Sequence, residues 1–167
     1  EIKGWSEAGC TAGQWKPVRK LDYDFSVLTG QGSGKVSLMD EVKPKEIFET
    51  PEGDLVIDFG QNMSALIQVT ATGKKGDVIR LDCFEVLDSK GNVYLDNLRG
   101  AKESLQYTFG EDGTITYRPS FTFMGFRYAK IVSFPGTPEP GNFIAHAIHT
   151  NMERTGFLET SNPDLNQ

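Results

Sequence analysis

The sequence predicts an all-β protein, a two-layer antiparallel β-sandwich of the jelly-roll type, preceded by an irregular N-terminal segment. From Lys43 onward, short β-prone runs follow one another closely, Gly- and Asp-containing turns separate them, and no helical periodicity lies between them. Regularly spaced strands of this kind are typical of sandwiches and jelly rolls. The predicted strands cover residues 45–50, 55–59, 65–72, 78–87, 93–95, 103–109, 114–117, 126–134 and 143–150.

The second of these strands shows the alternation of a half-buried strand most clearly. Leu55, Ile57 and Phe59 fall on one face, and the residues between them fall on the other. The pentapeptide 58–62 closes this strand, and its Gly60 and Asn62 tolerate a positive φ. We therefore expect the chain to turn here into the next strand.

The chain before this region, residues 1–43, has weak periodicity and is interpreted as a connector or the tail of a preceding domain. Trp5 and Trp15 can be read as rings that stack on sugars, or as residues that fill a small core or a domain seam. The second reading is favoured because tryptophan is highly buried on average. The sandwich domain is predicted over residues 44–158. Residues 159–167 then resemble the start of a helix or linker, with Pro just inside a cap-like Ser or Asn, and we expect a further domain downstream.

Composition and charge disfavour several classes of function. Of the 167 residues, 38% are hydrophobic and 24% charged, which is typical of a folded globular domain. The net charge of -6 and the lack of clustered basic residues disfavour a nucleic-acid partner. No run approaches the ~20 apolar residues of a membrane helix, so no membrane partner is predicted.

Glu85 is the most informative single residue. It shares a face of its predicted strand with four apolar side chains, so its carboxylate should point toward the core or the edge of a concave face. A buried carboxylate needs a cationic partner or a raised pKa, and Arg127, which also faces an apolar layer, is the predicted partner. The pair can bracket vicinal hydroxyls of a sugar, or it can be a structural ion pair between two strands. The structural interpretation is favoured.

Other reactive side chains predict neither a catalytic set nor a metal site. His146 and His149 fall on opposite faces of one strand, so they cannot hold a metal together, and each is predicted to be a hydrogen-bonded packing residue. A disulfide between Cys10 and Cys83 is disfavoured, because a buried single cysteine usually behaves as a small hydrophobe. No cofactor is predicted.

Several stretches, taken together and in order, carry a family resemblance. They are DFGQNM at 58–63, EVLD at 85–88, GNVY at 91–94, NLRGA at 97–101, YRPSFTFMGFRY at 117–128, ERTGF at 153–157 and SNP at 161–163. From residue 43 to its end the chain resembles the bacterial α-L-rhamnosidases of glycoside hydrolase family 78, in the concanavalin-like β-sandwich domain that precedes their catalytic barrel. The first forty or so residues resemble the tail of that family's preceding β-domain.

This resemblance implies a parent enzyme that releases terminal α-L-rhamnose with inversion, using carboxylic acids on an (α/α)6 barrel. Those acids would lie beyond Gln167, so no catalytic residue is assigned to this chain, and no pair of its carboxylates is fixed at the separation that a glycosidase uses. The candidate carbohydrate-binding or interdomain residues are Asp58, Gln61, Asn62, Glu85 and Arg127.

Two functions are compatible with these features. The first is a non-catalytic domain that packs against neighbouring domains of the same polypeptide and holds the barrel in register. The second is a carbohydrate-binding module that grips rhamnosyl groups of a glycan through Glu85, Arg127 and the turn at 58–62. An extracellular or periplasmic location is expected of a bacterial enzyme that degrades polysaccharides.

Overall fold

A computed structural model describes residues 2, 4–11, 13, 15–32 and 34–166 of the chain. The chain divides into two compact units, one that extends to Gly32 and one that contains all the strands. Within the described part of the first unit the one regular element is a 3-10 turn, η1 (Phe25–Val27), which the side chain of Asp24 caps. Trp5 and Trp15 are 63% and 55% exposed, so neither fills a core among the described residues.

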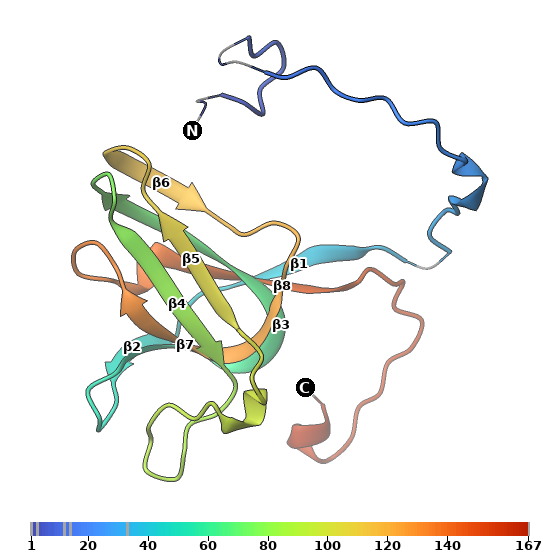
Figure 1. The fold of residues 1–167 in the computed structure, drawn as a ribbon. Helices are drawn as coiled ribbons and strands as arrows, with labels where there is room; N and C mark the ends of the chain where they lie inside the picture. The colour runs from blue at the N-terminus through green and yellow to red at the C-terminus, as the bar shows by residue number, and fades with distance from the viewer. Residues whose placement is uncertain (1, 3, 12, 14, 33, 167) are drawn as a thin grey trace. The chain divides into compact units, whose positions relative to one another are not determined.

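The second unit is a curled antiparallel sheet, which confirms the predicted fold class (Figure 1). The strand order is β1-β8-β3-β7-β4-β5, with β2 and β6 each paired to β3. The strands are β1 (Val36–Val42), β2 (Glu46–Glu49), β3 (Leu55–Gly73), β4 (Val78–Phe84), β5 (Ser104–Thr108), β6 (Gly113–Tyr117), β7 (Met124–Ser133) and β8 (Phe143–Thr150). Three further 3-10 turns are η2 (Asp96–Leu98), η3 (Pro140–Asn142) and η4 (Pro163–Leu165).

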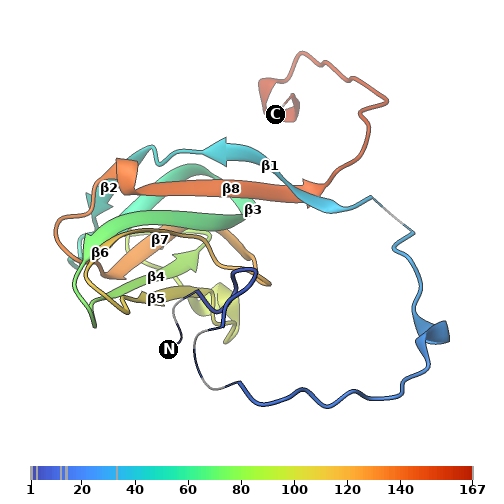
Figure 2. The same ribbon diagram turned by 90° about the horizontal axis from the view of Figure 1, so that it is seen from above.

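The long strand β3 connects the two layers of the sandwich. Its first part, up to Asp58, pairs with β2 on one side and β7 on the other, whereas residues 65–69 pair with β8 and residues 69–73 with β6. Because its partners change along its length, the sheet folds over on itself. Figure 2 shows β1 and β8 lying over β7, β4 and β5.

The main core lies between the layers and is almost entirely aliphatic and aromatic. Alternation places Ile57, Ile67 and Val69 of β3 in it, together with Ile79 and Leu81 of β4, all fully buried. The buried phenylalanines Phe59, Phe109, Phe126 and Phe143 complete it.

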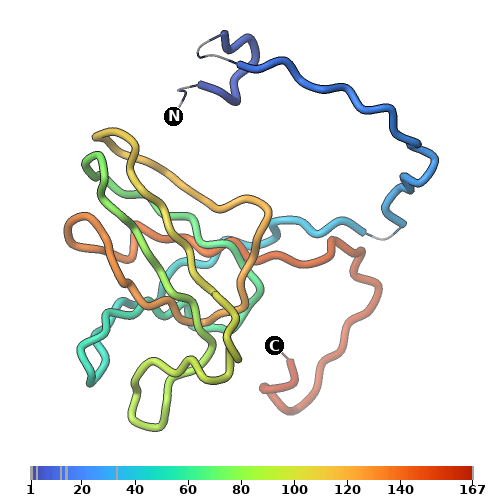
Figure 3. The backbone as a smooth tube through the Cα atoms, viewed as in Figure 1, coloured from blue at the N-terminus to red at the C-terminus, as the bar shows by residue number. Residues whose placement is uncertain are grey.

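A second, smaller core lies on the face of β3, β4 and β7 that points away from the main core. Val56, Phe84 and Tyr128 alternate with main-core residues along their strands, and the rings of Phe84 and Tyr128 stack with centroids 5.3 Å apart. Leu87 and Val93, which form an isolated bridge, pack against this cluster. The excursion of residues 85–103 between β4 and β5, seen as a yellow-green loop in Figure 3, therefore covers part of this face.

Several predicted elements differ in the structure. The predicted turn at 58–62 is wrong, because β3 continues through it. The strand predicted at 78–87 ends at Phe84, and the one predicted at 93–95 is reduced to the single bridge at Val93. Residues 36–42 were expected to be part of the irregular segment, yet they form β1, an edge strand on β8. None of the helices in the described part of the chain has the length and apolar character required to cross a bilayer.

Candidate functional site

The predicted site residues surround an irregularity where β3 pairs with β7. Asp58 lies opposite Tyr128 and Met63 lies opposite Phe126, so residues 59–62 face Arg127 alone. Gly60 takes a φ of 83°, which a glycine adopts without steric cost, and its N–H donates to Asp58 Oδ1 at 2.6 Å. The segment predicted as a turn is therefore an enlarged bulge within one strand, with four residues opposite one.

Arg127 occupies the space opposite this bulge and pairs with Asp58, not with Glu85 as predicted. Its Nε and Nη2 donate to the two carboxylate oxygens of Asp58 at 2.9 and 2.8 Å, a bidentate arrangement. The Asp58 side chain is 6% exposed and that of Arg127 is 35% exposed. The Arg127 hydrogen bonds hold the pKa of Asp58 below its usual value, against the opposing effect of burial, and the Gly60 N–H adds to the lowering.

Glu85 is held by amides in place of a cation. Asn62 Nδ2 donates to Glu85 Oε1 at 3.1 Å, and Asn97 Nδ2 donates to Glu85 Oε2 at 2.8 Å. Asn62 lies in the bulge and Asn97 in the turn η2, so this carboxylate ties the excursion of residues 85–103 back to β3. Gln61 is exposed beside them. Asn97 was not predicted as a site residue, although it belongs to the NLRGA stretch that supports the family resemblance.

Four of the five predicted residues thus form two neighbouring hydrogen-bonded groups. The ion pair of Asp58 and Arg127 is mostly internal, whereas the group of Asn62, Glu85 and Asn97 is at the surface and offers amides and a carboxylate to solvent. Both oxygens of each carboxylate already accept hydrogen bonds from neighbouring side chains. The arrangement suits structural bonding or recognition of hydroxyl groups, and it has no carboxylic acid positioned as a proton donor opposite a free base.

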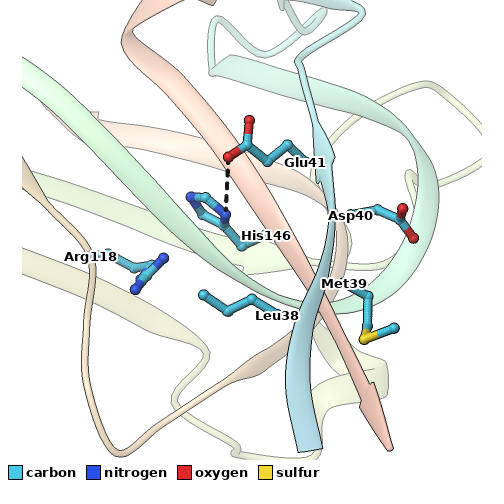
Figure 4. A pocket seen from close by; sticks show the side chains of 6 residues that line it. All are labelled: Leu38, Met39, Asp40, Glu41, Arg118 and His146. Atoms are coloured by element: carbon cyan, nitrogen blue, oxygen red, sulfur yellow. Dashed lines mark ion pairs between the residues drawn. The ribbon is translucent and has the colours of Figure 1, made fainter. Parts of the chain in front are cut away.

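A shallow pocket of about 220 Å³ lies elsewhere, between β1, β8 and the connection after β6 (Figure 4). It is lined by Leu38, Met39, Asp40, Glu41, Arg118 and His146. His146 is buried; its Nε2 lies 3.3 Å from Gln68 Oε1, and its Nδ1 lies 3.9 Å from Glu41 Oε1. This agrees with the predicted role of His146 as a hydrogen-bonded packing residue.

The prediction that His149 is a packing residue is wrong, because His149 is exposed; its Nδ1 lies 3.0 Å from the carbonyl oxygen of Thr150. Across the described ranges, no three His, Cys, Asp or Glu side chains are grouped so that they could hold a metal ion. Cys10 and Cys83 are both free, and Cys83 is buried in the main core.

Comparison with known proteins identifies the family. Residues 48–149 match the family model of the bacterial alpha-L-rhamnosidase concanavalin-like domain. The chain belongs to this family. This match confirms the resemblance drawn from the separate sequence stretches. The curled antiparallel sheet described above is consistent with a concanavalin-like domain.

Several complete α-L-rhamnosidases are similar to this chain over all or most of its length. It is 35% identical over 100% of its length to an alpha-L-rhamnosidase of Streptomyces avermitilis, of which it covers 16%. The crystal structure of native α-L-rhamnosidase from Aspergillus terreus matches 99% of the chain with a TM-score of 0.89 and 34% identity, over 19% of that enzyme. The structure of the Streptomyces avermitilis enzyme with L-rhamnose matches 83% of the chain with a TM-score of 0.76 and 36% identity, over 14% of that enzyme. The chain therefore spans less than a fifth of these relatives.

Proposed function

We propose that this chain is a non-catalytic β-sandwich domain of a multidomain α-L-rhamnosidase and that it holds the catalytic helical domain in place. The observation that carries the proposal is the family match over residues 48–149, in a chain that covers only 16% of an alpha-L-rhamnosidase 35% identical to it. The candidate residues are consistent with a supporting role, because each carboxylate among them is already engaged by neighbouring side chains.

Hydrolysis of an aryl α-L-rhamnoside tests this proposal. We expect the complete polypeptide to release the aryl group and the 167-residue chain to show no activity above buffer, because the latter lacks a positioned acid and base. Activity in the 167-residue chain would overturn the assignment as a non-catalytic domain. An inactive but folded complete polypeptide would overturn the assignment to an α-L-rhamnosidase.

A second candidate function, a carbohydrate-binding module for rhamnosyl groups, is favoured by one observation. The surface group of Asn62, Glu85 and Asn97 presents amide donors and carboxylate acceptors beside Arg127, and hydroxyl groups of sugars are recognised by such groups.

Calorimetric titration of the 167-residue chain with L-rhamnose separates the two functions. Millimolar or tighter binding that disappears in Glu85→Gln would support the module. The matched control is Asp82→Asn, which changes a carboxylate on β4 that accepts hydrogen bonds from Arg80 of the same strand and Ser104 of β5, and which should leave any binding unchanged. We expect no heat of binding in any of the three proteins if the domain only supports its neighbours.

A further inference from the structure

Phe121 has an unusual backbone conformation for an aromatic residue. Its φ is 65°, in the left-handed region where a bulky side chain is a genuine outlier. Its side chain is fully exposed, at 107% of the reference area, so the ring gains no packing within the described chain. A strained residue of this kind persists where the surrounding structure determines it, and such residues cluster at functional sites.

The connection that holds Phe121 is fixed at both ends. Pro119 is buried on one side, and Met124 is buried where β7 begins on the other. Between them Phe123 is also 61% exposed. The connection is therefore anchored at both ends and exposes two phenylalanine rings. A contact with these rings would cost little conformational entropy, because the backbone that carries them is already fixed.

The edge strand β1 also exposes apolar side chains. Val36, Leu38 and Met39 are 61%, 45% and 39% exposed, and the register of β1 shifts between Leu38 and Asp40. In the described sheet β1 pairs with β8 alone, so its other edge is unpaired. Leu38, Met39 and Arg118 line one pocket, which places the start of the β6–β7 connection beside β1 (Figure 4).

The C-terminal segment leaves the sheet next to this surface. Val36 of β1 lies opposite Thr150, the last residue of β8, and Asn151 N–H donates to the Lys35 carbonyl at 2.9 Å. Residues that follow in the segment expose further large apolar side chains, Met152 at 74% and Phe157 at 83%. A domain that follows this segment in the polypeptide would therefore begin beside β1.

We propose that Phe121, Phe123 and the exposed edge of β1 form a docking surface for the catalytic domain of the same polypeptide, and that this domain supplies an apolar recess for the two rings. The inference rests on the proposed function, because the occupant is the catalytic domain assigned there. The length of the relatives supports an occupant in the same chain, since the matched part is at most 19% of the enzymes compared. Aromatic residues of this kind are the usual anchors of interdomain and intermolecular contacts.

Thiol labelling at position 121 tests the proposal. In a Cys10→Ser background, Phe121→Cys is compared in the 167-residue chain and in the complete polypeptide, using a maleimide reagent. Within the 167 residues the other cysteine, Cys83, is buried, and labelling is quantified by mass spectrometry on the proteolytic peptide that contains position 121. We expect the thiol to label at least about tenfold more slowly in the complete polypeptide, because burial in an interface core excludes the reagent. Lys75→Cys, in the exposed turn between β3 and β4, is the control and should label at the same rate in both.

Phe123→Cys serves as a second reporter if the first variant does not fold. Equal labelling of both reporters in the two proteins would overturn the docking surface, and so would protection in the 167-residue chain that grows with its concentration, since that would indicate a second copy as the occupant. Rhamnosidase activity of the complete polypeptide is measured in parallel. Activity without protection refutes the surface alone, whereas protection without activity refutes the proposed enzyme and leaves the docking contact in place.

Discussion

Replacing Arg127 with Leu should destabilise the sandwich by about 2 kcal/mol. The substitution leaves the Asp58 carboxylate, which is 6% exposed, with the Gly60 N–H as its remaining hydrogen bond among those described. Removing one partner of a buried ion pair typically costs about 3–5 kcal/mol. Arg127 is itself 35% exposed, so solvent screening weakens the ion pair. We therefore expect a cost below that range, of about 2 kcal/mol.

Urea denaturation followed by circular dichroism near 215 nm measures this effect. The β signal reports the sandwich, because the described part of the first unit contains no strand, whereas Trp5 and Trp15 both lie in that unit and would not report it. With an m-value of about 2 kcal/mol/M, the midpoint should fall by about 1 M. Arg127→Lys keeps the charge but not the bidentate geometry and should lose about half as much. A loss below about 0.5 kcal/mol for both variants would refute this account of the bulge.

The same pair predicts a pH dependence with a defined sign. The pKa of Asp58 is lowered in the folded protein, chiefly by the Arg127 hydrogen bonds. Its contribution to stability is therefore complete above the unfolded value of about 4 and is lost as the pH falls through the folded value. We expect the stability difference between the wild type and Arg127→Leu to shrink below a pH of about 4 and to stay constant above about 6. A difference that is independent of pH would show that the ionised carboxylate is not its source.

Three further predictions concern single positions. Gly60→Ala should cost about 1 kcal/mol in urea denaturation, because its φ of 83° is unfavourable for alanine while the nearest atom to a new Cβ, Lys45 Cδ, is 3.9 Å away; an unchanged midpoint would contradict it. Gly73→Ala should cost about 1–3 kcal/mol for a different reason, since its Cβ would lie 2.8 Å from the buried Phe109 ring, and combining it with Phe109→Leu should recover part of the loss. A disulfide reagent should modify Cys10 at least about 100-fold faster than Cys83, because burial raises the pKa of the Cys83 thiol, and equal rates in the native protein would contradict the buried position.

Alternation identified most strands from the sequence, but it could not distinguish a turn from a bulge at residues 58–62. Both need a residue with positive φ, and Gly60 supplies it in either case. The chain continues in β3 because it pairs with β7, where Arg127 binds Asp58 across 69 residues of sequence. No signal in the five residues themselves indicates a partner so distant.

Two other errors have similar physical causes. β1 was missed because it is an edge strand exposed on both faces for most of its length, so burial gives it no period of two. The expected pair of Glu85 and Arg127 assumed that β4 continued to residue 87, whereas it ends at Phe84 and leaves Glu85 in a loop. The set of candidate residues was nevertheless useful, since Asp58, Asn62, Glu85 and Arg127 do lie around one bulge.

The pairing of β1 with β8 has a mechanical consequence. The two strands are antiparallel, with Val36 opposite Thr150, so the segments that lead into and out of the sheet leave from the same end of this pair. Tension applied through those two segments would peel the strands apart one hydrogen bond at a time, as in a zipper, and would not load all the bonds of the ladder together. A multidomain enzyme built on this sheet would therefore open first at β1 when its flanking domains are drawn apart, while β3 and its four partners remain paired.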